Sequence, residues 1–177
     1  MIRLCWGIFL CTCLSLLTVS QTQAQNCTGG IPYAKAMWKA YKAKAQVAGP
    51  ERRQTALKMW RSQTSGQGKA PQALEPKKLQ QGQLWSQSSR YFVSLPVQKD
   101  ELSLYFILNK GEGKVKLNIC TMDAKGQQKH IQTMVLNEET GKEGKKIRLR
   151  DVRGQVLVVQ LRNFGAIGAV GYKLGIQ

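Results

Sequence analysis

The sequence predicts a mainly β protein, an antiparallel and jelly-roll-like β-sandwich that is preceded by a short basic helical segment. Two observations carry this prediction. From residue 85 onward, short runs rich in Val, Ile, Leu, Tyr or Phe recur between turn residues, which is typical of a sandwich. Before residue 65, apolar residues instead recur at the three- and four-residue spacing of a helix, interspersed with Lys and Arg.

Residues 1–24 are typical of a secretory signal peptide. Arg3 supplies a basic start, an apolar run follows over 4–19, and Thr22 and Ala24 are small residues suited to cleavage after Ala24. The run is shorter than the roughly 20 apolar residues that a membrane span needs. We therefore expect residues 25–177 to be secreted or periplasmic.

Two cysteines remain once residues 1–24 are removed, Cys27 and Cys120. An even pair in an exported protein favours a disulfide, which would tie the mature N-terminus to the middle of the chain. The alternative is a pair of free thiols, with Cys120 a buried strand residue.

The charge is strongly positive, with a formal net charge of +17. Residues 25–90 carry 12 Lys and Arg against 2 acids, and residues 91–177 carry 14 against 8. Such an excess attracts polyanions, and the expected partners are an anionic surface, a polysaccharide or a protein. Nucleic acid is a further polyanion, although no motif supports it. The alternative is that the charge only keeps the protein in solution.

The segment 25–65 predicts two helices. The first begins at Pro32, which suits a first helical turn, and ends before Gly49-Pro50. The second runs from Glu51 to about Thr64, with an acid in its first turn. The first helix has an apolar stripe of Ala34, Met37, Trp38, Tyr41 and Ala45.

Basic side chains on these helices are the candidate anion-binding residues: Lys35, Lys39, Lys42, Arg52, Arg53, Lys58 and Arg61. Trp38 and Trp60 are candidates for stacking or membrane insertion beside these charges. The competing interpretation is that both tryptophans pack in a core, which is where aromatic stripes at helical spacing usually lie.

Residues 66–84 are rich in Gln, Ser, Gly, Pro and Lys, a composition that predicts an exposed linker. The sandwich domain then covers 85–177. Its expected strands are 90–95, 102–108, 114–120, 130–135, 145–150, 155–161 and 169–176. In the strand 155–161, Val156, Val158 and Gln160 lie opposite Leu157, Val159 and Leu161, so this strand is expected to be covered on both sides.

The region 83–177 resembles the pre-peptidase C-terminal β-sandwich domains appended to secreted bacterial peptidases. The segments that carry the resemblance are Tyr91-Phe92-Val93, Leu102 with Leu104, Asp123-Ala124-Lys125-Gly126 and Gly171-Tyr172-Lys173-Leu174. The family's acidic stretch in mid-domain is absent, and residues 116–120 stand there instead. The resemblance therefore implies a non-catalytic accessory module and carries no metal-linked role over to this chain.

Residues suited to catalysis are few. His130 is the one histidine, and the acid pairs Asp100-Glu101 and Glu138-Glu139 fall in expected turns. No spacing indicates a metal site or a phosphate-binding loop, so we expect no enzyme activity, cofactor or metal. The hypothesis is a binding protein that attaches to an anionic surface or polyanion. The alternative is an accessory subunit or inhibitor that binds a protein partner and has its helices packed on the sandwich. A hydrolase would need a cleft that the sequence does not reveal.

Overall fold

The computed structural model describes residues 27–65, 70–111 and 113–177, so the predicted signal peptide lies outside the described residues. The helical part comprises η1 (Thr28–Gly30), α1 (Ile31–Ala43) and α2 (Gly49–Thr64). The strands are β1 (Gln72–Leu74), β2 (Leu79–Trp85), β3 (Ser89–Ser94), β4 (Leu102–Lys110), β5 (Val115–Met122), β6 (Gln128–Leu136), β7 (Lys145–Leu149), β8 (Val156–Asn163) and β9 (Ala169–Ile176). A short helix, α3 (Glu138–Lys142), precedes β7.

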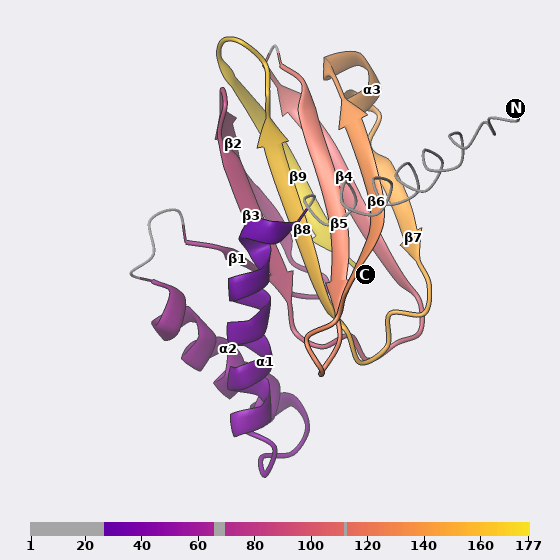
Figure 1. The fold of residues 1–177 in the computed structure, drawn as a ribbon. Coiled ribbons are helices and arrows are strands. Elements are labelled where there is room, and N and C mark those ends of the chain that lie inside the picture. Colours follow the sequence, from indigo (N-terminus) through magenta and orange to yellow (C-terminus); the bar gives the residue numbers. More distant parts are fainter. Residues whose placement is uncertain (1–26, 66–69, 112) are drawn as a thin grey trace, which may run out of the picture.

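The strands form two sheets, which confirms the predicted β-sandwich (Figure 1). The first sheet has the order β1-β3-β8-β5-β6, and the second has the order β2-β9-β4-β7. Neighbouring strands pair antiparallel except β1 and β3, which are parallel. All seven expected strands are present, with ends that differ by a few residues from the prediction.

The main core lies between the two sheets and consists of the inward-facing side chains of both. Strand β8 shows the alternation most clearly. Leu157, Val159 and Leu161 point into this core, while Val156 and Val158 point to the opposite face of the first sheet. The prediction that this strand is covered on both sides is therefore confirmed.

Helices α1 and α2 cover the outer face of the first sheet and create a second apolar core there. The buried residues of α1 recur every three positions, so they form one stripe: Ile31, Ala34, Met37 and Ala40. Gly30 lets the chain approach the sheet closely, because a Cβ at this position would lie 2.5 Å from Val158 Cγ1. A disulfide joins Cys27 to Cys120 on β5, with 6.3 Å between their Cα atoms.

The structure corrects the prediction that residues 66–84 form an exposed linker. The described part of this segment contains β1 and β2, and β2 is an edge strand of the second sheet that pairs with β9 over its whole length. The Gln-rich sequence of β2 has few apolar residues because only one side chain, Leu84, is buried. Backbone hydrogen bonds to β9 hold the strand, and composition gives no signal for such pairing.

Candidate anion-binding site

Helix α1 presents its lysines on the side opposite the buried stripe. Lys35, Lys39 and Lys42 are exposed, and Trp38 is half-buried beside them. Lys35 and Lys39 lie one helical turn apart, so their ammonium groups share one face of the helix. Neither side chain has a hydrogen bond or ion pair with the described residues.

The turn between β5 and β6 faces these lysines and is held rigidly by its own residues. Asp123 Oδ1 accepts hydrogen bonds from the backbone N–H of Lys125 at 2.9 Å and of Gln127 at 2.8 Å. Gly126 has a φ of 86°, a conformation that glycine adopts without strain. The Asp-x-x-Gly segment therefore fixes the turn and leaves the Lys125 side chain exposed in solvent.

Two hydrogen bonds hold α1 on this turn, and a contact within the helix joins the two side chains that make them. The indole Nε1 of Trp38 donates to the Met122 carbonyl at 3.2 Å, and Lys42 Nζ donates to the Ala124 carbonyl at 2.8 Å. Lys42 Nζ also lies 5.6 Å from the centre of the Trp38 ring, within cation–π range. Trp38 and Lys42 thus fix the position of the helix relative to the sheet.

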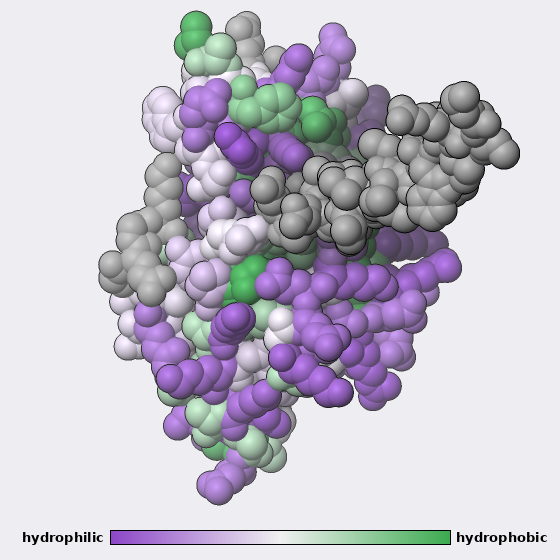
Figure 2. Space-filling model, viewed as in Figure 1, coloured by the Kyte–Doolittle hydropathy of each residue, from purple (hydrophilic) through white to green (hydrophobic). Residues whose placement is uncertain are grey.

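Together these residues line an open groove of about 410 Å³ between α1 and the β5–β6 turn. Four ammonium groups line it, from Lys35, Lys39, Lys42 and Lys125, against the single carboxylate of Asp123. Figure 2 shows hydrophilic residues gathered over this part of the surface. Because four lysines face one carboxylate, the groove presents a positive face beside the half-buried Trp38 ring.

Two of the three predicted arginines, Arg52 and Arg61, bind other groups of the protein. Arg52 Nε and Nη2 donate to the Tyr41 carbonyl at 3.3 and 3.1 Å, and its guanidinium carbon lies 4.0 Å from the centre of the Tyr41 ring. This arginine therefore joins the end of α1 to the start of α2. Arg61 pairs with Glu75 at 2.9 Å, and Lys78 binds the other oxygen of the same carboxylate. The expectation that Arg61 is free to meet an anion is wrong.

The prediction that Trp60 is available for stacking or membrane insertion is also wrong. Trp60 is 1% exposed, and its Nε1 donates to the Tyr33 carbonyl at 2.9 Å, so it packs between α2, α1 and the first sheet. It cannot stack on a ligand without unfolding this core. The two remaining candidates are also outside the groove: Lys58 is exposed on α2, and Arg53 lines a separate pocket.

Sequence reasoning did not select Lys125 as a site residue, although it identified the turn that contains it. Residues 35–42 and 122–126 are about 80 positions apart, and only the docking of α1 on the first sheet brings them together. The apolar stripe of α1 indicates that the helix docks, but no sequence signal tells which sheet edge or turn it meets.

No protein-family model matches the chain, and no curated protein matches it. Solved structures similar to it include the pre-peptidase C-terminal domain of a collagenase from Bacillus anthracis, in agreement with the resemblance inferred from the sequence. That domain is 9% identical over 63% of this chain and 98% of its own, with a TM-score of 0.46.

Two further solved structures are similar. The surface-associated copper-binding protein CorA of Methylomicrobium album is 4% identical, with 61% of this chain and 97% of that chain covered and a TM-score of 0.42. PliG of Aeromonas hydrophila, a periplasmic inhibitor of g-type lysozyme, is 12% identical, with 60% and 96% covered and a TM-score of 0.40.

Within the described ranges, no helix has the length and apolar character to cross a membrane. The same residues contain no cluster of three or more His, Cys, Asp or Glu suited to a metal. His130 is half-buried, and its Nε2 lies 2.9 Å from Thr133 Oγ1, whose hydroxyl in turn donates to Asn118 Oδ1. This chain of contacts runs between β5 and β6.

Proposed function

We propose that the protein is a non-catalytic, exported binding protein that attaches to an anionic surface or polyanion through the groove between α1 and the β5–β6 turn. The observation that carries this proposal is the set of three lysines without partners among the described residues, Lys35, Lys39 and Lys125, around the half-buried Trp38. The hydrogen bonds of the turn and the Trp38 and Lys42 contacts fix the helix and the turn that carry these lysines before any ligand arrives.

The physical gain comes from charge. Each Lys or Arg near an anionic membrane contributes about 1 kcal/mol, and salt weakens this contribution because exposed charges are screened. Trp38 adds apolar area and a ring face beside the ammonium groups. Binding should therefore weaken steeply as ionic strength rises.

The test compares two double variants with the same change of net charge. Lys35→Glu with Lys39→Glu removes two groove lysines, whereas Lys146→Glu with Arg148→Glu reverses two exposed charges on β7 of the second sheet. We expect the groove variant to elute from heparin at lower salt and to bind anionic vesicles at least about 30-fold more weakly. Equal losses for the two variants would show that net charge alone is responsible and would overturn the proposal.

A second candidate is an accessory subunit or inhibitor that binds an acidic protein partner. The observation that favours it is that α1 and α2 are packed on the first sheet and linked to it by the disulfide, which makes the groove a fixed surface. The same experiment separates the two candidates. A wild-type protein that is not retained on heparin or anionic vesicles at low salt would favour the protein partner.

A further inference from the structure

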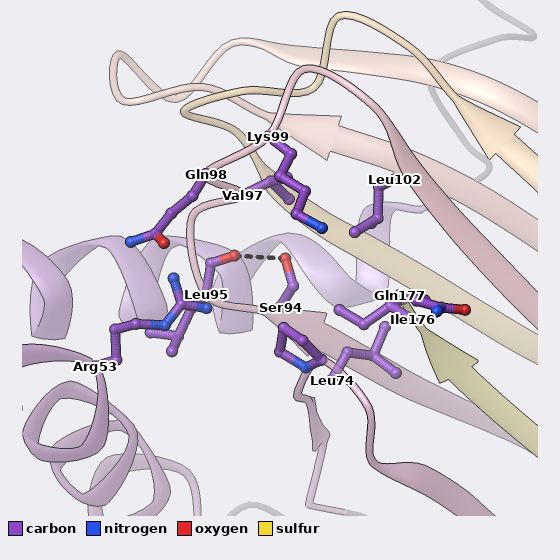
Figure 3. Close-up of a pocket in the computed structure, with 11 residues that line it drawn as sticks. Arg53, Leu74, Ser94, Leu95, Val97, Gln98, Lys99, Leu102, Ile176 and Gln177 are labelled. Carbon is purple, nitrogen blue, oxygen red and sulfur yellow. Dashed lines mark hydrogen bonds between the residues drawn. The ribbon is translucent and has the colours of Figure 1, made fainter. Parts of the chain in front are cut away.

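A second concave site lies at the end of the sandwich near α2 (Figure 3). Its walls are aliphatic and come from four separate segments: Leu74 of β1, Leu95 and Val97 after β3, Leu102 of β4 and Ile176 of β9. These five residues belong to the two hydrophobic cores, so the pocket is an opening at the place where the cores meet the surface.

Two cations line this pocket, Arg53 from α2 and Lys99 from the loop before β4. Within the described part of the chain, neither side chain makes a hydrogen bond or an ion pair, in contrast to Arg52 and Arg61 on the same helix. No Asp or Glu is among the lining residues. The acids that follow Lys99 are paired with other residues, Asp100 with Arg153 at 3.8 Å and Glu101 with Arg150 at 3.5 Å.

The buried polar side chain of the lining, Ser94, is already used. The Ser94 hydroxyl donates to the Leu95 carbonyl at 2.7 Å and accepts from the Leu157 backbone N–H at 2.9 Å. A ligand inside would therefore meet mainly hydrocarbon, and its polar group would lie among the exposed amides of Gln98 and Gln177 and the two cations. An apolar site with a few well-placed polar groups is the usual composition of a small-molecule pocket.

The volume limits the size of the ligand. The pocket holds about 120 Å³, and an engineered apolar cavity of about 150 Å³ binds benzene. One aromatic ring at the partly open mouth, or an aliphatic chain of about four to six carbons, fits this space. A long acyl chain does not.

We propose that this pocket binds a small apolar monocarboxylic acid, with the hydrocarbon against Leu74, Leu95 and Ile176 and the carboxylate at Arg53 and Lys99. A guanidinium matches a carboxylate in two parallel hydrogen bonds, which favours Arg53 as the main partner. The inference is independent of the proposed function, since none of these residues lines the groove beside α1.

Benzoate is the first probe, and the methyl NMR signals of the disulfide-bonded wild-type protein are the readout. We expect saturable shifts confined to Leu74, Leu95, Val97, Leu102 and Ile176. Hexanoate should give the same pattern, and the neutral analogue benzamide should bind about tenfold more weakly because it cannot pair with the cations. Equal affinity for benzamide and benzoate, or shifts spread over the whole surface, would overturn the proposal.

Arg53→Gln should weaken benzoate about tenfold, and Lys58→Gln, a charge removal on the same helix outside the pocket, should leave the affinity unchanged. Val97→Phe should abolish binding by filling the space, and Leu102→Met serves as a milder variant if the first fails to fold. Wild-type affinity in Arg53→Gln, or binding of dodecanoate but not of hexanoate, would refute the assignment.

Discussion

Removal of the Cys27–Cys120 disulfide tests how the helices and the sandwich are held together. The bridge spans 93 positions, so it closes a long loop in the unfolded chain. In the chain-entropy model, a loop of that length corresponds to about 4.6 kcal/mol of stabilisation, against a total stability of about 5–15 kcal/mol for a typical domain. Both cysteines are buried, at 2% and 4% exposure, so removing the two sulfur atoms also leaves a small void that adds to the loss.

We expect Cys27→Ala with Cys120→Ala to lose about 3–5 kcal/mol of unfolding free energy, because measured losses for native disulfides are commonly about 2–5 kcal/mol. Urea unfolding followed by far-UV circular dichroism measures this loss as a midpoint lower by about 2 M. Wild-type protein treated with a reductant is the matched control and should unfold at the same midpoint as the variant. A loss below about 1 kcal/mol at an unchanged urea slope would refute the reasoning, because the loop would then not be closed in the native protein.

Two more predictions concern buried aromatic residues. Trp60→Ala should cost about 3–5 kcal/mol of unfolding free energy, and Trp38→Ala should cost less because Trp38 is only half-buried. Urea unfolding measures both losses. A loss below about 1 kcal/mol for Trp60→Ala would contradict its core position. Burial raises the pKa of the Tyr172 hydroxyl above its ordinary value near 10, and the nearby charge of Arg90 offsets only part of this rise. The unfolded chain then loses this proton first, so stability is complete below about pH 10 and falls as the pH rises further. Melting temperatures measured from pH 8 to 11.5 should fall less steeply for Tyr172→Phe, and an unchanged slope would contradict the prediction.

Much of the fold follows from local patterns. The seven expected strands were predictable because their alternation and turn residues are properties of neighbouring positions, as in β8, where residues 156–159 are apolar on both faces. The two helices were predictable from the spacing of residues such as Ala34 and Met37 and from the Pro residues near their starts. Strand β2 was not, because the hydrogen bonds that it makes with β9 leave no mark in a Gln-rich sequence.

The candidate site divides in the same way. The sequence predicted a basic helix surface, and Lys35, Lys39 and Lys42 are indeed exposed. It could not separate Trp38 from Trp60, since each follows a methionine and precedes a basic residue within an amphipathic helix. Which tryptophan is buried depends on the angle at which each helix meets the first sheet.

The sequence alone determined the sandwich class, the two basic helices and the cysteine pair, because periodicity, composition and residue counts can be read without knowing which residues meet in space. Only the tertiary structure decided that Arg61 is paired with Glu75, that Lys125 joins the lysines of α1, and that Arg53 and Lys99 line an apolar pocket. These pairings join residues from 14 to about 90 positions apart. They depend on how the two cores pack together, which no short stretch of sequence specifies.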